Sequence, residues 1–213
     1  MESNTVWLAS FPRSGNTLLR TILWQCLGLR SASVYPSDLG GNKKLEEYVG
    51  HLEHDQLGRI AFPQDAISLI KTHEHANDDR PAIYVIRDGR DACMSLWKFY
   101  DKTLPLEAII RGQHRFGTWA SHVESWHPLD RPNTLLLKYE DLISNLPSTL
   151  ACLSTFLKRE IVKGSIPDRS TIAESDGRWV RNKERERSVL PESLLEQFKH
   201  VNGRVMKQFG YGD

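Results

Sequence analysis

The amino-terminal segment constrains the fold more than any other part of this chain. An apolar run at residues 5–10 ends in a turn at residues 11–17 (FPRSGNT), after which apolar residues recur at helical spacing as far as Leu27. A short buried strand that passes through such a turn into a helix is typical of a parallel sheet covered by helices. We therefore expect an α/β fold.

The rest of the chain continues this alternation of strand and helix. Because no repeat, low-complexity tract or linker interrupts it, we expect a single domain over residues 1–213, with a mainly parallel β-sheet flanked by helices. Further strands are predicted at residues 66–70, 82–86 and 134–137. Helices are predicted at residues 91–100, 106–126 (one long helix or two shorter ones), 142–157 and 191–209.

Charge and composition exclude several classes of protein. Lys and Arg total 28 against 27 Asp and Glu, so the chain lacks the basic excess of a dedicated nucleic-acid binder. No apolar run approaches the roughly 20 residues of a membrane span, and the first residues do not resemble a signal peptide, so we expect a cytoplasmic protein. Three scattered cysteines without CxxC spacing suggest neither disulfides nor a zinc site; we expect them to be buried as small apolar groups.

Basic residues follow three of the predicted strands. Arg13, Lys71 and Arg87 come at or just after the ends of the runs at 5–10, 66–70 and 82–86. Since ligands of parallel sheets bind beyond the carboxyl ends of the strands, these cations should converge on one edge. A local pocket for a polyanion is therefore expected despite the formal net charge of +1.

The turn at residues 11–17 has two interpretations. Gly15 allows close approach of the backbone to an anion, and Ser14, Asn16 and Thr17 supply donors at a helix amino terminus. Alternatively it is a plain strand-to-helix turn in which Asn16 or Thr17 is the N-cap. The G-x-x-x-x-G-K-[ST] spacing of a Walker A loop is absent, which counts against an ATP-dependent kinase.

This turn resembles the 5'-phosphosulfate loop (YPKSGTTW) of sulfotransferases that use 3'-phosphoadenosine 5'-phosphosulfate (PAPS). The resemblance implies that Arg13, Ser14, Gly15, Asn16 and Thr17 bind the co-substrate, within a sulfotransferase fold similar to that of P-loop nucleotide hydrolases. Arg13 stands where cytosolic members have a catalytic lysine, and the Golgi tyrosylprotein sulfotransferases are similar in using arginine. Arginine suits charge stabilisation rather than proton donation, because it stays protonated.

The segment at residues 84–95 (YVIRDGRDACMS) extends the resemblance. In the family, an arginine and a serine eight positions later bind the 3'-phosphate, and Arg87 and Ser95 have that separation. Without the family, the charges would be interpreted as a solvated cluster that caps a helix. Asp88 and Asp91 are expected to act as capping or ion-pairing groups.

Residues 70–73 (IKTH) resemble the Lys-Thr-His that closes a strand in cytosolic sulfotransferases. The resemblance implies that Lys71 assists at the transferring group and that His73 is the general base toward the acceptor. A histidine with an ordinary pKa near 6.5 is suited to this, because it is largely neutral at pH 7 and can still accept a proton. Glu74 is the second candidate base, since Golgi-type members use a carboxylate.

Two later segments complete the resemblance, and a third departs from it. Residues 116–126 resemble an aromatic helix of the family, which we interpret mainly as core, and residues 137–142 (LKYEDL) imply that Tyr139 contacts the nucleotide. The basic triplet that usually closes over the 3'-phosphate is missing. Residues 181–187 are either a solvated helix start or part of a replacement set of cations: Arg178, Arg181 and Lys183.

These observations predict a sulfotransferase that moves the sulfuryl group of PAPS, without a metal ion, to a hydroxyl of a small acceptor or, as second preference, to an amine. Two alternatives remain open: a non-catalytic module that binds PAPS or 3'-phosphoadenosine 5'-phosphate (PAP), and a P-loop-like small-molecule kinase. The sequence leaves the acceptor and the oligomeric state open.

Overall fold

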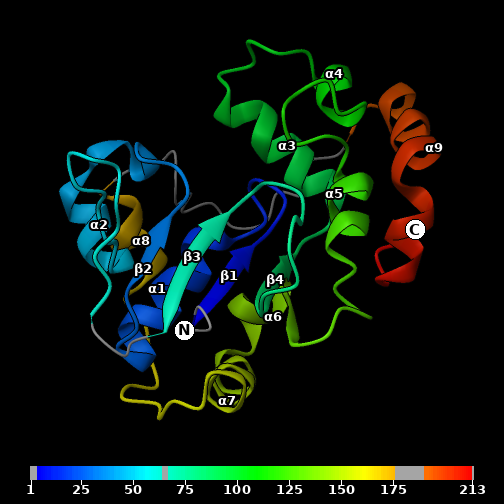
Figure 1. The fold of residues 1–213 in the computed structure, drawn as a ribbon. Coiled ribbons are helices and arrows are strands. Elements are labelled where there is room, and N and C mark those ends of the chain that lie inside the picture. Colours follow the sequence, from blue (N-terminus) through cyan, green and yellow to red (C-terminus); the bar gives the residue numbers. More distant parts are fainter. Residues whose placement is uncertain (1–3, 64–66, 176–189, 213) are drawn as a thin grey trace.

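The computed structural model describes residues 4–63, 67–175 and 190–212. At its centre lies a five-stranded sheet of order β2-β3-β1-β4-β5 (Figure 1), in which each neighbouring pair runs parallel. The strands are β1 (Thr5–Ala9), β2 (Ser31–Ser33), β3 (Ser68–Thr72), β4 (Ala82–Ile86) and β5 (Thr134–Lys138). Their carboxyl ends therefore share one edge of the sheet.

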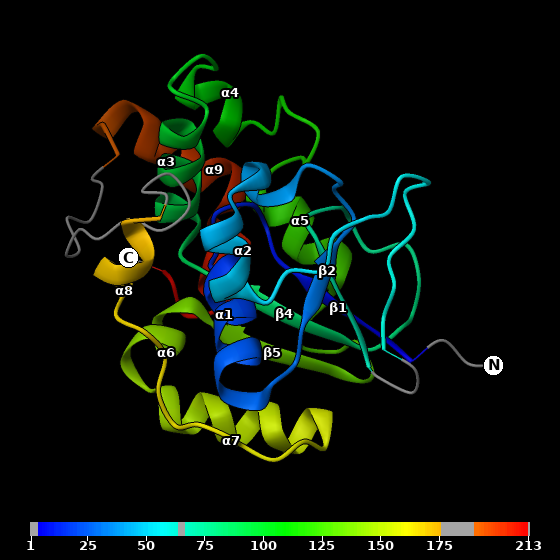
Figure 2. The same cartoon turned by 90° about the vertical axis from the view of Figure 1, so that its left-hand side faces the viewer.

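Helices cover both faces of the sheet, and the alternation along β4 shows why. Ala82, Tyr84 and Ile86 pack into the core of one face, whereas Ile83 and Val85 pack into the core of the other. The first face is covered by α3 (Gly89–Phe99), α4 (Leu106–Ile110), α5 (Trp119–Trp126) and α9 (Glu192–Gln208). The second is covered by α1 (Asn16–Leu27), α6 (Tyr139–Ser144) and α7 (Leu146–Leu157), as Figures 1 and 2 show.

A smaller apolar cluster lies beside the β2 edge. It joins the short 3₁₀ helix η1 (Asp38–Gly41), α2 (Lys43–Val49) and α8 (Arg169–Ala173), a helix from much later in the sequence. Ile172 of α8 packs there against the fully buried side chains of Leu39, Leu45 and Val49. This packing fixes η1, whose first residue is part of the site described below.

The structure confirms the α/β class and the mainly parallel sheet flanked by helices. The strand at residues 82–86 is found as predicted, whereas the one predicted at 66–70 is β3, two residues later; Ala66 lies outside the described residues. The helix predicted at 142–157 is two helices, because Asn145 ends α6 and caps α7 by accepting from the Ser148 backbone N–H. The span 106–126 is likewise two helices, α4 and α5.

The strand β2 was not predicted, since its sequence Ser-Ala-Ser has no apolar pattern. It is a strand because it pairs with β3, and all three of its residues are buried. The expected burial of the cysteines holds for Cys26 and Cys93 but is wrong for Cys152, which α7 exposes. Among the helices in the described residues, none is long and apolar enough to cross a membrane.

Candidate functional site

The loop between β1 and α1 has a backbone that requires glycine. Gly15 has φ 107°, and an ideal Cβ there would lie 2.5 Å from Cδ2 of Tyr139. Gly15 is also the N-cap of α1, with no side chain to cap the helix, so the interpretation of Asn16 or Thr17 as N-cap is wrong. Asn16 instead uses its Nδ2 to donate to the Leu8 carbonyl at 2.8 Å, which ties the loop to β1. Thr17 follows in the first turn of α1 and is partly buried.

Three buried polar atoms at this edge lack a hydrogen-bond partner among the described residues: Ser14 Oγ, Asn16 Oδ1 and Arg87 Nε. Leaving a buried polar atom unpaired is costly, so such atoms call for an explanation. A serine hydroxyl and a guanidinium N–H are both donors that suit phosphate or sulfate oxygens. Together with the unpaired N–H groups that begin any α-helix, they make this edge fit an anionic ligand.

Arg87 links three segments of the site. Its Nη1 donates to the Arg13 carbonyl at 3.1 Å, and its guanidinium lies 4.4 Å from the centre of the Tyr139 ring. Asp91 lies 3.6 Å from Arg87 Nη2, and Asp88 caps α3 by accepting from the Arg90 backbone N–H. Arg13 and Arg87, two of the three cations expected to converge, thus meet beside Tyr139, and the two aspartates have the capping and ion-pairing roles expected for them.

The side chain of Arg13 lies against α3. Its Nε is 3.3 Å from Ser95 Oγ, and its guanidinium lies 4.8 Å from the centre of the Phe99 ring. Arg13 and Ser95, two of the residues carried over from the family, therefore meet although 82 positions separate them. The nucleotide-binding candidates of the loop, β4, α3 and the end of β5 form one continuous group.

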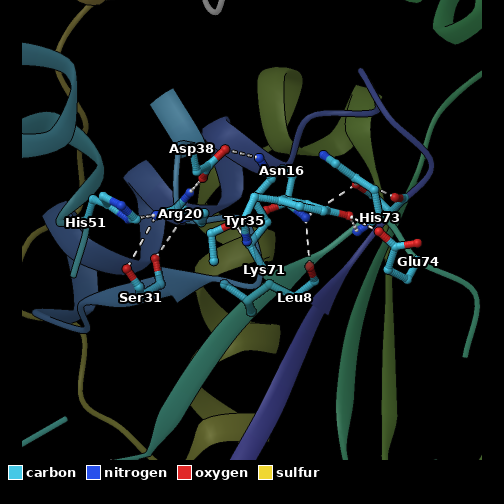
Figure 3. A network of polar contacts seen from close by, with 12 residues as sticks. Leu8, Asn16, Arg20, Ser31, Tyr35, Asp38, His51, Lys71, His73 and Glu74 are labelled. Atoms are coloured by element: carbon cyan, nitrogen blue, oxygen red, sulfur yellow. Dashed lines mark hydrogen bonds and ion pairs between the residues drawn. The ribbon is translucent and has the colours of Figure 1, made fainter. Parts of the chain in front are cut away.

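Lys71, the third of the cations expected to converge at this edge, is bound by Asp38, and the charge of Arg13 acts on it. Its buried ammonium donates to Asp38 Oδ1 at 2.5 Å, and Arg20 Nη1 donates to Asp38 Oδ2 at 2.6 Å (Figure 3). Arg20 Nη2 also lies 2.8 Å from Nδ1 of His51. Sequence analysis did not predict that Arg20, Asp38 and His51 would come together. The one available signal was Arg20 itself, a charge in an otherwise apolar stretch of the predicted helix.

His73 is held in one tautomer by the end of β1. Its Nδ1 lies 2.7 Å from the Ser10 carbonyl oxygen, which can only accept, so Nδ1 carries the hydrogen and Nε2 carries the lone pair. Burial, and then the charge of Lys71, lower the pKa of His73 well below its ordinary value. His73 is therefore neutral at pH 7 and can accept a proton at Nε2.

Glu74 and Tyr35 frame His73 (Figure 3). The Tyr35 hydroxyl accepts from the His73 backbone N–H at 3.0 Å and donates to Glu74 Oε1 at 2.9 Å. Glu74 also forms an ion pair with Arg115. Tyr35 and Arg115 both donate to Oε1 of Glu74. The remaining candidates, Arg178, Arg181 and Lys183, lie outside the described residues.

The fold is an α/β fold of the P-loop-like kind, in which a non-Walker loop joins the first strand to the first helix, and its buried donors, which lack a partner among the described residues, suit an anion. Residues 3–210 match the sulfotransferase domain family, and the chain belongs to that family.

Comparisons with individual proteins agree with this assignment. The chain is 27% identical over 177 residues to human sulfotransferase 4A1, covering 74% of this chain and 61% of that protein. It is 24% identical over 206 residues to the luciferin sulfotransferase of Photinus pyralis, covering 78% and 54%. The chain thus spans about three fifths of the length of sulfotransferase 4A1 and about half that of the luciferin sulfotransferase.

Solved structures support the fold. A retinol dehydratase in complex with retinol and PAP has a TM-score of 0.67 at 17% identity, covering all of this chain and 83% of that one. The mouse sulfotransferase SULT7A1 complexed with PAP has a TM-score of 0.55 at 22% identity, covering 87% and 69%.

Proposed function

We propose that this protein transfers the sulfuryl group of PAPS to a hydroxyl of a small acceptor, or as second preference to an amine. The observation that carries the proposal is the convergence of the Gly15 loop, Arg87 and Tyr139 around buried donors that have no partner in the described structure. Membership of the sulfotransferase family supports it, as does the fact that two structural neighbours are complexes with PAP.

In this proposal the loop and α3 hold the nucleotide. Ser14, Thr17 and the first N–H groups of α1 bind the 5'-phosphosulfate, with Gly15 allowing close backbone approach. Arg87 and Ser95 bind the 3'-phosphate, and Tyr139, already stacked on Arg87, contacts the nucleotide. Arg13 stabilises the charge on the leaving oxygen, which arginine can do without losing its proton, and Lys71 assists at the transferring group.

The transfer itself needs an in-line nucleophile and a proton acceptor. Nε2 of His73 takes the proton of the acceptor hydroxyl while the acceptor oxygen forms a bond to sulfur. The bond between sulfur and the bridging oxygen of PAPS breaks, and PAP leaves. His73 suits this role because Ser10 fixes its tautomer and leaves Nε2 as the accepting atom.

Calorimetric titration with PAP, and separately with ATP and Mg²⁺, tests the nucleotide site. We expect PAP to bind and ATP not to match it, and Arg87→Ala to weaken PAP binding by roughly 10- to 150-fold, the value of a charge-assisted hydrogen bond. Arg59→Ala is the control, because Arg59 also pairs with a carboxylate four residues away but is exposed. Tighter binding of ATP than of PAP would favour the kinase alternative.

Sulfuryl transfer from radiolabelled PAPS to a panel of phenols, alcohols and amines tests catalysis. His73→Ala should lower turnover by roughly 10²- to 10⁴-fold, as loss of a general base does, while PAP affinity is retained. Glu74→Gln should have a much smaller effect. Full turnover in His73→Ala together with loss in Glu74→Gln would reverse the assignment of the base. PAP binding without transfer to any acceptor would favour the non-catalytic module.

The domain limits 1–213 and the cytoplasmic location remain predictions.

A further inference from the structure

A buried ion network around Lys71 lies next to the proposed transfer site, and two of its members, Asp38 and Arg20, have no role in the function proposed so far. Asp38 bridges two cations, with Lys71 on one carboxylate oxygen and Arg20 on the other. The side chains of all three are less than 5% exposed. Arg20 is fixed in turn by Ser31, whose Oγ accepts from Nε at 2.8 Å, and by His51.

Among the described residues, Asp38 is the anion that bonds directly to both cations, and Glu46 of α2, also buried, acts on Arg20 and His51. Lys71 and Arg20 together bring two charges and Asp38 brings one. Burial, and then the charge of Arg20, lower the pKa of His51 to about 4, so His51 is neutral at pH 7. The groups that act on Lys71 from the surrounding elements are Asp38 of η1, Arg20 of α1 and Arg13 of the loop, and the ring of Tyr35 lies 5.7 Å from the ammonium. Lys71 in turn acts on His73 and His51. Among these, Asp38 is the anion in direct contact with the Lys71 ammonium.

The backbone around Asp38 is held in place from outside the site. Leu39, the next residue, has φ 61°, a left-handed conformation that costs a non-glycine residue of order 1–3 kcal/mol. It is held there by its fully buried side chain, which packs with Leu45, Val49 and Ile172. Such strain persists where surrounding packing over-determines it, and functional sites are where it gathers. The position of Asp38 is therefore set by tertiary packing rather than by its local sequence.

We propose that Asp38 is a positioning residue for the transfer reaction: it keeps Lys71 in the ammonium form and fixes that ammonium at the carboxyl end of β3, while Arg20 orients Asp38. The inference rests on the proposed function insofar as Lys71 acts on the transferring group. Burial, and the nearby charges of Arg20 and Arg13, favour the neutral amine, and Asp38 opposes them.

Two substitutions should move the pKa of Lys71 in opposite directions. Asp38→Asn removes the neighbouring anion and leaves two buried cations, so the pKa of Lys71 should fall by about 1–3 units. Arg20→Met removes a neighbouring cation and keeps Asp38, so the pKa of Lys71 should rise. A general loss of stability would not shift the pKa of Lys71 in opposite directions in the two variants. Asp55→Asn is the matched control, because Asp55 forms an exposed ion pair with Arg59 and should leave Lys71 unchanged.

The measurement is a pH titration of the protein labelled with ¹³C-lysine, followed by NMR, with the Lys71 signal assigned from Lys71→Met. This readout needs neither nucleotide nor acceptor, and it remains available from Arg20→Met if Asp38→Asn does not fold. Lys71 titrating at the same pH in the wild type and in a folded Asp38→Asn variant would overturn the proposal. If Lys71 titrates at the same pH in Arg20→Met as in the wild type, the role proposed for Arg20 is overturned.

The same variants are then compared in sulfuryl transfer from PAPS to the best phenol of the panel. Asp38→Asn should lower kcat by about 10²-fold through misplacement of Lys71, with the KM for PAPS changed less. The alkaline limb of its pH–rate profile should move to lower pH by the same 1–3 units. A wild-type kcat and pH profile in Asp38→Asn would overturn the positioning role. Failure of the wild type to bind PAP would instead count against the proposed function, and the NMR titration would still decide the link between Asp38 and Lys71.

Discussion

Replacing Gly15 by alanine tests the loop on which the proposed anion site depends. The added Cβ would lie 2.5 Å from Cδ2 and 3.1 Å from Cε2 of the Tyr139 ring. Carbon atoms prefer separations of roughly 3.5–4.0 Å, so either the ring or the loop must move. Moving the ring separates it from the Arg87 guanidinium, and moving the loop displaces α1 and the Arg13 carbonyl that Arg87 binds.

The cost has two parts that can be measured separately. An L-residue held in the left-handed region costs about 1–2 kcal/mol relative to glycine. Forcing an extra methyl group into packed surroundings costs about 1–3 kcal/mol more. Gly15→Ala should therefore lower the free energy of unfolding by about 2–5 kcal/mol.

Urea unfolding of five proteins separates the two parts: the wild type, Gly15→Ala, Gly28→Ala, Tyr139→Ala and the double variant Gly15→Ala/Tyr139→Ala. Gly28→Ala is the control, because Gly28 has φ 67° at the end of α1 and its Cβ would meet no heavy atom within 4 Å. It should cost only the backbone part, about 1–2 kcal/mol. In a Tyr139→Ala background the ring is gone, so Gly15→Ala should cost the backbone part alone. PAP affinity should fall in Gly15→Ala and be retained in Gly28→Ala.

Two results would refute this reasoning. One is a cost for Gly15→Ala that does not exceed the cost for Gly28→Ala. The other is the same cost for Gly15→Ala with and without the Tyr139 ring, since the two positions are then not coupled.

Three further predictions concern the packing around the site. The pKa of His51 is lowered to about 4, so between pH 6.5 and 4 the imidazole is protonated in the unfolded chain but not in the folded one. The free energy of unfolding should therefore fall by about 3 kcal/mol over that range. His51→Gln should flatten this part of a profile of unfolding free energy against pH, measured with urea. When a thiol reagent is applied to the native protein and labelling is followed by mass spectrometry, the exposed Cys152 should be modified first. Cys26 and Cys93 are buried, and burial raises the pKa of both thiols, that of Cys93 to about 12. Equal labelling of Cys93 and Cys152 would contradict this prediction. Leu8→Ala in the centre of the sheet should lower the free energy of unfolding by about 2–5 kcal/mol in urea titration, and a loss under about 0.5 kcal/mol would mean that this core is not packed as described.

Much of the nucleotide-binding half of the site could be predicted from the sequence. Arg13 and Arg87 each come at or after the end of an apolar run, and in a parallel sheet the ends of adjacent strands meet at one edge. The same argument brings Tyr139, which follows β5, to Arg87. The resemblance to a known family added Ser95, which lies on α3 against Arg13.

The environment of Lys71 could not be predicted in this way. Asp38 lies in a short 3₁₀ helix with no periodic pattern, and it meets Lys71 across 33 positions of sequence. The three-residue strand β2 could not be predicted either, because its residues are small and have no apolar pattern, and only pairing with β3 makes them a strand. Sequence patterns report local periodicity, whereas these contacts depend on which distant segments pack together.

By itself, the sequence determined the alternation of strands and helices, the parallel sheet, the glycine loop and the edge at which the arginines gather. Each of these follows from side-chain periodicity or from backbone freedom at a single residue, which are local properties. Only the tertiary structure decided that Lys71 turns to Asp38, that Ser10 fixes the tautomer of His73, and that Tyr139 closes against Gly15. Those outcomes depend on the burial and pairing of groups far apart in the chain, because a buried charge or donor takes whatever partner the fold brings within reach.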